Sequence, residues 1–284
     1  MSSIPSMQGK TCLVTGSNSG IGKYTALALA KAGAEVILCC RNPDKGKAAL
    51  EEIREATGNQ RLSLLLGDLG SRRDIERMAQ EFKAKHSLLH VLVNNAGLVS
   101  RKRKETEDGL EMTFGVNHIG PFYLTWHLLE LLKDTAPSRI VNVASEAHRF
   151  GRMRFDDLQS KQKYRTMQVY GMSKTCNILF TRILAQKLEG SGVTVNSLHP
   201  GAVSTNLGKS EGPGWLFKLL SLFFLTPQQG AETSIYLATS PAVEGVSGEY
   251  FDKKKPRKLA RHAQSQEDAV RLWKISEEIC GISW

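Results

Sequence analysis

The sequence predicts an α/β protein in which one doubly wound parallel sheet of seven strands carries helices on both of its faces. Short β-rich segments alternate with longer helical segments along the whole chain of 284 residues. The strand segments are apolar on both sides, which is typical of parallel strands that helices cover on each face. No repeat, linker or low-complexity segment divides the chain, so we expect a single domain over residues 1–284.

The expected elements follow one another in a regular order. The strands are residues 11–15, 35–40, 62–66, 91–94, 139–143, 193–198 and 247–250. The helices between them are residues 20–32, 44–56, 72–85, 110–132, 168–188 and 228–238, and a last helix covers residues 266–279. Residues 146–167 and 205–227 interrupt this order, and long insertions in a compact domain are usually functional loops.

The fifth helix illustrates the pattern that identifies a helix. Its apolar residues recur at i, i+3, i+4, i+7 and i+8 and therefore form one face. These residues are Cys176, Leu179, Phe180, Ile183 and Leu184.

Composition and hydropathy exclude several classes of protein. Hydrophobic residues make up 41% of the chain and charged residues 23%, so a sizeable core is available and wholesale disorder is not expected. The longest apolar run, from Trp215 to Leu225, contains Lys218 and Ser221 and is shorter than the roughly 20 residues that span a bilayer. The five cysteines lack metal-ligand spacing. We expect a soluble, cytoplasmic protein with reduced thiols and no metal site.

The net charge of +10 is concentrated in basic clusters at residues 101–104 and 253–258. Neither cluster lies in a recognisable nucleic-acid-binding motif, so nucleic acid is not an expected partner. A solvated basic surface is the first interpretation, attraction to an anionic membrane is the second, and attraction of an anionic cofactor is compatible with both.

A glycine-rich turn joins the first expected strand to the first helix. It reads Thr15-Gly-Ser-Asn-Ser-Gly-Ile-Gly22, with GxxxGxG spacing. Glycines permit the backbone to approach a pyrophosphate closely, and the following helix N-terminus offers unpaired N–H groups to the phosphates. A tight structural turn is the alternative. The turn predicts a dinucleotide site that includes Gly16, Ser17, Ser19, Gly20, Ile21 and Gly22.

The second strand ends at Cys40 and is followed by Arg41. A carboxylate at position 40 would bind the adenine-ribose hydroxyls and repel a 2′-phosphate, whereas a cysteine is neutral. The guanidinium of Arg41 can bind a phosphate monoester through two hydrogen bonds. The sequence therefore favours NADP(H), although Ser19 stands where a second basic residue would strengthen the site. The alternative is that Arg41 is an ordinary loop charge.

Tyr170 and Lys174 lie four residues apart on the fifth helix and so share one face. A phenol with a pKa of about 10 is a poor base at neutral pH, and a neighbouring ammonium favours its phenolate. Ser145 follows the fifth strand, at the edge of the sheet where ligands bind. Its hydroxyl can bind a substrate oxygen and position the carbonyl carbon for hydride transfer.

The chain resembles the short-chain dehydrogenase/reductases along nearly its whole length. The resemblance is carried by the turn at residues 15–22, Asp68-Leu69, Asn94-Asn95-Ala96-Gly97, Asn117, Ser145, Tyr170-x-x-x-Lys174 and Pro200-Gly201, all in the family's order. The segments at residues 117–122 and 145–148 are similar to those of the retinol dehydrogenase-like subgroup. The stretch from Ser145 to Tyr170 is longer than in most of the family by roughly a dozen residues, which the subgroup tolerates.

The resemblance implies a Rossmann-type fold, a nicotinamide cofactor and a set of site residues. Its implied catalytic residues are Asn117, Ser145, Tyr170 and Lys174, with Asn117 holding a water of a proton relay. Besides Tyr170 and Lys174, its implied cofactor contacts are Asp68, Leu69, Asn94, Ala96, Gly97, Pro200, Gly201, Val203 and Thr205. Family members pair as dimers or tetramers, so a homo-oligomer is one expectation.

The apolar segment at residues 213–225 falls where the family places its mobile substrate-binding loop, at about residues 205–227. An apolar loop beside a hydride-transfer site implies a lipophilic substrate such as retinal, retinol or a long-chain carbonyl compound. Peripheral membrane contact through residues 215–225 is a second interpretation, and a dimer contact or core helix is a third.

The leading hypothesis is an NADP(H)-dependent oxidoreductase that interconverts a lipophilic aldehyde or ketone and its alcohol. Its alternatives are a catalytically silent NADP(H)-binding sensor or scaffold, and an enzyme of the same family acting on another small carbonyl compound or a steroid. A sensor is expected to have lost part of the Tyr-Lys pair, whereas this sequence keeps it.

Overall fold

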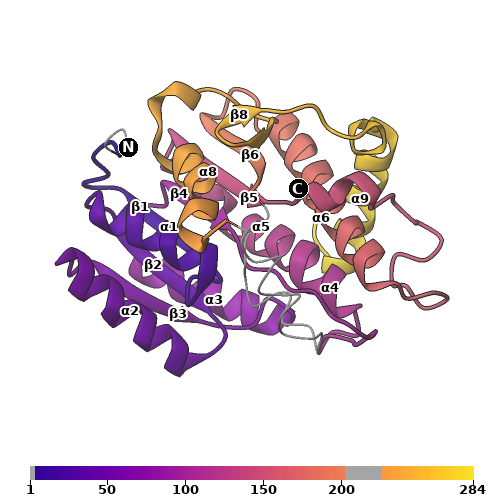
Figure 1. Ribbon diagram of the computed structural model, residues 1–284, viewed down its shortest axis with the longest axis horizontal. Coiled ribbons are helices and arrows are strands. Elements are labelled where there is room, and N and C mark those ends of the chain that lie inside the picture. The colour runs from indigo at the N-terminus through magenta and orange to yellow at the C-terminus, as the bar shows by residue number, and fades with distance from the viewer. Residues whose placement is uncertain (1–3, 202–224) are drawn as a thin grey trace.

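The computed structural model describes residues 4–201 and 225–284 (Figure 1). Its described strands form one sheet in the order β3-β2-β1-β4-β5-β6-β7-β8, and all neighbours are parallel except β7 and β8. The strands are β1 (Thr11–Thr15), β2 (Glu35–Cys40), β3 (Leu62–Leu66), β4 (Val91–Asn94), β5 (Ser138–Val143), β6 (Val193–His199), β7 (Tyr250–Asp252) and β8 (Lys255–Pro256). The predicted doubly wound parallel sheet is thereby confirmed.

The predicted number of seven strands was wrong by one. β8 contains only two residues and pairs antiparallel with β7, with Phe251 opposite Pro256. A lysine and a proline carry no apolar alternation, so the sequence pattern gives no strand signal there. The hairpin forms because Lys253 and Lys254 take left-handed backbone conformations with φ values of 50° and 63°. The seventh predicted strand, at residues 247–250, is found at Tyr250–Asp252 instead.

The helices follow the predicted order, with short helices at several of their ends. The α-helices are α1 (Gly20–Lys31), α2 (Pro43–Thr57), α3 (Arg72–Lys85), α4 (Met112–Phe114), α5 (Gly120–Asp134), α6 (Thr166–Lys187), α8 (Pro227–Thr239) and α9 (Gln266–Cys280). The other helical turns are η1 (Gly115–Ile119, a π-helix), η2 (Glu146–Phe150), η4 (Pro241–Val243) and η5 (Arg261–Gln264). The single helix predicted at residues 110–132 is therefore α4, η1 and α5 in succession.

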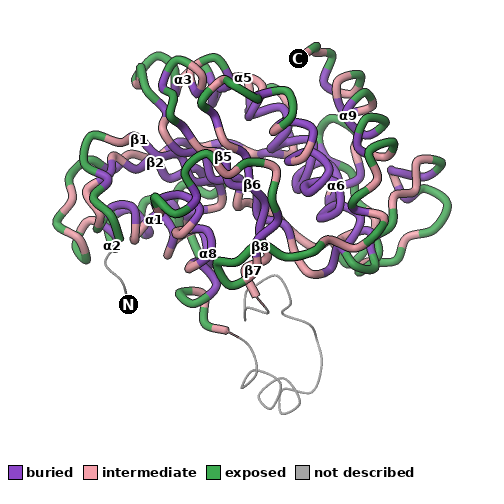
Figure 2. The backbone as a smooth tube through the Cα atoms, turned by 90° about the horizontal axis from the view of Figure 1, so that it is seen from above, coloured by how far each residue is buried: buried purple, intermediate pink, exposed green. Residues whose placement is uncertain are grey.

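Helices cover both faces of the sheet in two layers (Figure 2). Alternate residues of β1 point to opposite sides, so that Leu13 joins the core under α3, α5 and α6 while Val14 joins the core under α1, α2 and α8. The two larger apolar cores of the described residues thus lie on opposite sides of the sheet.

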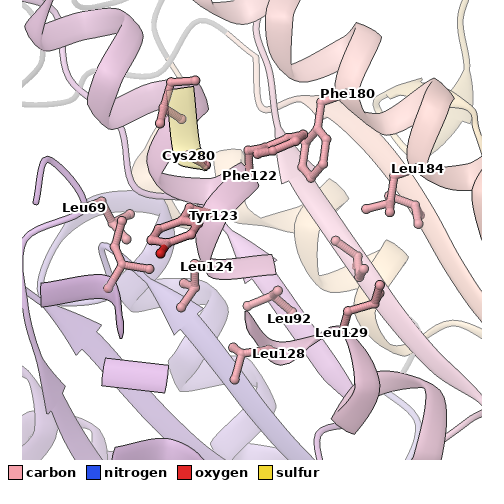
Figure 3. Close-up of a cluster of buried hydrophobic side chains, with 14 of the residues drawn as sticks. Leu69, Leu92, Phe122, Tyr123, Leu124, Leu128, Leu129, Phe180, Leu184 and Cys280 are labelled. Carbon is pink, nitrogen blue, oxygen red and sulfur yellow. The ribbon is translucent and has the colours of Figure 1, made fainter. Parts of the chain in front are cut away.

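The larger core lies under α5 and α6 and is closed by α9. Figure 3 shows Phe122 of α5 facing Phe180 of α6, and their ring centres are 5.3 Å apart. From the C-terminal segment, Trp273 and Trp284 reach the ring of Phe122 at 5.1 and 5.3 Å. Aromatic pairs at such distances stabilise packing beyond the area they bury. The C-terminal helix is therefore part of the domain's core.

Three further features of residues 4–201 and 225–284 bear on function. Every cysteine of the chain is free and buried. No group of three or more His, Cys, Asp or Glu side chains in these residues has the geometry to hold a metal ion. Within the same ranges, none of the helices combines the length and apolar character needed to cross a membrane.

Candidate active site

The strand order reverses between β1 and β4, and a cleft of about 460 Å³ opens at the carboxyl ends of these strands. Doubly wound sheets bind their ligands at such a point. The turn after β1 forms one side of the cleft, and Tyr170 and Lys174 of α6 form the other. A larger hollow of about 900 Å³ lies at the amino edge of the sheet and contains none of the predicted site residues. The cleft is therefore the candidate active site.

The glycine turn lines this cleft, and two of its glycines leave no room for a Cβ atom. Gly16 has a φ of +66°, and a Cβ there would come within 2.9 Å of the Cα of Ala96. A Cβ on Gly22 would lie 2.4 Å from both the Asn95 amide nitrogen and the Gly16 carbonyl oxygen. Around Gly20, by contrast, nothing lies within 4 Å of an added Cβ, so the start of α1 faces open space. The turn at residues 15–22, called the cradle below, fits a pyrophosphate against backbone N–H groups.

Thr15 of β1 and Asn95 at the end of β4 hold the turn in place, a role that the sequence pattern did not predict for either residue. The Thr15 hydroxyl accepts hydrogen bonds from the N–H groups of Asn95 and Ala96, both at 3.0 Å. The Asn95 amide donates to the Thr15 carbonyl at 2.8 Å. Both residues belong to the quoted motifs, but bonds between positions 80 residues apart leave no periodic signal in the sequence. The two strands are thus tied together where the phosphates would bind.

The outer end of the cleft is charged and exposed. Arg41 keeps 69% of its side chain exposed and forms an ion pair of 3.0 Å with Asp68. Asp68 also accepts a hydrogen bond from the N–H of Gly70 at 2.8 Å, which fixes its carboxylate in the turn after β3. Cys40, Asp68 and Leu69 line the cleft beside Arg41. The guanidinium is therefore held at the cleft by a residue that was itself predicted to contact the cofactor.

The inner end of the cleft brings together Ser145, Tyr170 and Lys174. Lys174 is only 3% exposed; its ammonium donates to the Val143 carbonyl at 2.9 Å and lies 5.7 Å from the centre of the Tyr170 ring. The Ser145 hydroxyl accepts the N–H of Ala147 at 3.2 Å, and its side chain also interacts with the Tyr170 phenol. Ser145, at the junction of β5 and η2, is thus brought next to Tyr170 and Lys174 of α6.

Burial is the largest influence on the pKa values of Tyr170 and Lys174. Desolvation lowers the pKa of Lys174 to about 8, because the charged ammonium loses its hydration. Desolvation also raises the pKa of the Tyr170 phenol, and the interaction with the Ser145 side chain offsets part of that rise. Burial therefore favours the neutral phenol, and the effect expected of the Lys174 ammonium on it stays a prediction. Tyr170 stays protonated at neutral pH.

Asn117 lies behind the inner end, in the π-helix η1. Its amide oxygen accepts the N–H of Leu98 at 2.8 Å, and its amide nitrogen donates to the Leu98 carbonyl at 2.9 Å and to the Ser173 hydroxyl at 3.0 Å. A Cβ on Gly97 would lie 3.3 Å from the Asn117 oxygen and 3.4 Å from the Lys174 nitrogen. The side chain of Asn117 therefore fixes the turn after β4 against α6.

Some predicted cofactor contacts do not line the cleft. Asn94 points into the core, where its amide nitrogen donates to the Thr125 hydroxyl at 3.1 Å and to the Asn142 oxygen at 2.9 Å. Asn142 in turn donates to the Thr181 hydroxyl at 2.9 Å, so a chain of polar groups runs beneath the cleft. Ser17 is fully buried, with its hydroxyl donating to the Cys39 carbonyl.

Of the predicted contacts that follow β6, only Pro200 and Gly201 lie in the described part of the chain. Pro200 lines the cleft, whereas Gly201 lies against Leu225, whose side chain would be 2.3 Å from an added Cβ. Val203 and Thr205 lie outside the described residues, as does most of the predicted substrate loop at residues 205–227.

The long connection between Ser145 and Tyr170 packs beside the cleft mouth. The Tyr164 hydroxyl donates to the Ser100 carbonyl at 2.6 Å, and the Arg103 guanidinium donates to the Gln159 carbonyl at 3.0 Å. The basic cluster at residues 101–104 is thus partly used to attach this extension to the loop that follows β4.

Comparison with known proteins agrees with this geometry. The family model described as short chain dehydrogenase matches residues 10–214. Human retinol dehydrogenase 14 is 47% identical over 294 residues, and mouse retinol dehydrogenase 12 is 43% identical over 277 residues; each match covers 97% of this chain and 88% of the relative.

Solved structures show the same fold. The crystal structure of an uncharacterized protein from Mycobacterium paratuberculosis superposes with a TM-score of 0.82 at 30% identity, covering 99% of this chain and 96% of the other. The RhlG/NADP active-site complex of Pseudomonas aeruginosa superposes with a TM-score of 0.73 at 26% identity, covering 88% and 97%. The family uses nicotinamide cofactors, and the cradle, the cleft and the inner triad fit one. The chain belongs to the short-chain dehydrogenase/reductase family, in its retinol dehydrogenase-like branch, and is an oxidoreductase of carbonyl compounds and alcohols.

Proposed function

We propose that this protein uses NADP(H) to interconvert a lipophilic aldehyde or ketone and its alcohol. The observation that carries the proposal is the inner end of the cleft, where the Ser145 hydroxyl, the protonated Tyr170 phenol and the buried Lys174 amine lie together. A bound nicotinamide supplies or accepts the hydride. The residues of the chain do the rest.

Ser145 donates its hydroxyl proton as a hydrogen bond to the substrate oxygen and so orients the carbonyl carbon. Tyr170 acts as the general acid that protonates the developing alkoxide, a role that needs the neutral phenol that burial favours. Lys174 places a positive charge near that phenol and stabilises the negative charge passing through it.

The relatives named retinol dehydrogenase support a lipophilic substrate. The lining of the cleft supports it independently, because Leu98 and Val99 contribute apolar side chains beside Tyr170. An apolar chain attached to the reacting carbonyl would find hydrophobic contacts there.

Arg41 and Cys40 support NADP(H) over NAD(H). The Arg41 guanidinium is exposed at the cleft, and no charge on Cys40 repels a 2′-phosphate. A phosphate there would compete with Asp68 for the guanidinium, and phosphate offers it the same two-point hydrogen bonding as a carboxylate.

The proposal is tested by a panel of aldehydes and ketones that includes retinal and aliphatic aldehydes of increasing length. The oxidation of NADPH and of NADH is followed separately in each case. We expect turnover that increases with the apolar length of the aldehyde and that is faster with NADPH. Absence of turnover on the whole panel, with NADPH bound tightly, would instead favour a sensor or scaffold.

Tyr170→Phe is the matched control for this assay, because it removes only the phenolic oxygen. We expect turnover to fall by about 10³-fold, in the range that general acid catalysis contributes, while the Kd for NADPH measured by calorimetry stays nearly unchanged. Retention of full activity would remove Tyr170 from the mechanism.

A further inference from the structure

Two histidine rings hold opposite ends of the peptide bond that follows Ser145. Its carbonyl oxygen lies 2.8 Å from Nδ1 of His148, in η2. Its N–H, which belongs to Glu146, donates to Nδ1 of His199 at 3.1 Å. His199 is the last residue of β6, so the two rings reach the same peptide from different parts of the fold.

The contacts require opposite tautomers of the two rings. Nδ1 of His148 faces a carbonyl oxygen and must carry a proton, and its Nε2 faces the N–H of Ala260 at 3.4 Å and must offer a lone pair. Nδ1 of His199 accepts an N–H and must offer a lone pair, so its proton is on Nε2. Burial lowers the pKa of each ring, which keeps both neutral.

His148 is itself fixed by the C-terminal part of the chain. The residue is fully buried, and its ring packs edge-on against Tyr250 of β7 with ring centres 5.0 Å apart. Its carbonyl oxygen lies 2.7 Å from Nε2 of His262, in η5. The Tyr250 hydroxyl also donates to the Glu146 carboxylate at 3.3 Å. The ring that holds the Ser145 carbonyl therefore has little freedom to move.

The orientation of this peptide decides where the Ser145 hydroxyl points. Ser145 has an extended backbone with φ −165° and ψ 156°, and in this conformation its Oγ accepts the N–H of Ala147. A rotation of the peptide would displace Oγ from the substrate, and a displacement of about 1 Å at a reacting group costs on the order of 100-fold in rate.

We propose that His148 and His199 are positioning residues that fix the Ser145–Glu146 peptide and thereby aim the Ser145 hydroxyl at the substrate carbonyl. This inference rests on the proposed function for its catalytic consequence. The hydrogen-bonded arrangement itself does not depend on which substrate is used.

Leucine and asparagine substitutions at each histidine test the pair. Asparagine can place either an N–H or a carbonyl oxygen where Nδ1 stood, whereas leucine can place neither. We expect His148→Leu and His199→Leu to lower kcat by about tenfold or more, with the KM for NADPH changed by less than about twofold. His148→Asn and His199→Asn should recover most of the lost kcat.

His90→Leu is the matched control. His90 also accepts a backbone N–H at its Nδ1, from Thr11 at 3.0 Å, but it lies at the opposite edge of the sheet. We expect this variant to keep the kcat of the natural protein. Leucine variants of His148 and His199 with unchanged kcat would overturn the proposal. It would also be overturned if the asparagine variants failed to recover kcat while folding and cofactor binding were intact.

Nitrogen NMR of the histidine rings separates failure of this inference from failure of the proposed function. If the natural protein reduces no carbonyl compound, the proposed function fails, and the spectra still decide whether the two rings hold the peptide. We expect His148 to be the Nδ1–H tautomer and His199 the Nε2–H tautomer. Identical tautomers for the two rings would overturn the arrangement.

Discussion

The two ends of the cleft each contain a basic side chain, and their surroundings differ. At the outer end Arg41 is 69% exposed and is paired with the carboxylate of Asp68. At the inner end Lys174 is 3% exposed, and its ammonium donates a hydrogen bond to the neutral carbonyl of Val143. An exposed ion pair such as Arg41–Asp68 contributes only about 0–1 kcal/mol to stability. The buried Lys174 is affected differently, because desolvation lowers its pKa to about 8. The outer charge is suited to recognition and the inner charge to chemistry.

If this comparison is right, the largest effect comes from the inner charge. Lys174→Met should reduce kcat by about 10²- to 10³-fold, because the charge that stabilises the Tyr170 oxygen is lost. In the unaltered protein, the rate of reduction should fall as the pH rises through about 8, since the ammonium then loses its proton. A pH–rate profile measured at saturating NADPH checks this.

Lys174→Arg is the control for the pH effect, since a guanidinium keeps its charge throughout this range. Its profile should lack the fall near pH 8 even if its overall rate is low. A fall that persists unchanged in the arginine variant would assign it to another group.

An intermediate effect is expected at the backbone cradle between the two ends. Gly22→Ala places a Cβ 2.4 Å from the Gly16 carbonyl, and such overpacking costs about 1–3 kcal/mol. The displaced turn should weaken NADPH binding by about 10- to 100-fold, measured by calorimetry. Gly58→Ala is its control: Gly58 has a φ of +69° at the end of α2 and nothing near its Cβ position. It should lower the melting temperature and leave the Kd unchanged.

The smallest effect should come from the outer charge. Arg41→Asp should lower kcat/KM with NADPH by about tenfold, through loss of one charge-assisted contact, and should raise the relative use of NADH. Arg73→Asp provides the comparison, because Arg73 is 82% exposed and pairs with Glu107 away from the cleft. If the preference between the two cofactors is the same before and after the Arg41 change, Arg41 does not recognise the 2′-phosphate.

The sequence predicted best those features that depend on neighbours along the chain. The glycine turn follows from the conformations its residues permit, and the pairing of Tyr170 with Lys174 follows from one helical turn. The parallel sheet follows from strands that are apolar on both sides.

Features that depend on distant residues escaped prediction. The hydrogen bonds of Thr15 with Asn95 and of His148 with the Ser145 carbonyl join residues from separate elements. The short edge strand β8 has no apolar pattern. Asn94 was predictable in principle: strand residues alternate, and Asn94 must share the side of Leu92, which faces the core under α5. The burial of Tyr170, which raises the pKa of its phenol, could not be predicted, because the spacing of Tyr170 and Lys174 does not reveal it.

The polar chain from Asn94 through Asn142 to Thr181 has a consequence for how the protein reaches its native state. These groups meet only when β4, β5 and α6 are aligned in one register. Sliding β4 by one residue would leave buried amides without partners, at a cost of about 1–3 kcal/mol for each. An apolar core tolerates many near-equivalent alignments, whereas this ladder of amides accepts one. The same alignment places Asn95 beside Thr15. A shifted register of β4, which would distort the cleft, is therefore already destabilised by the unpaired amides in the core.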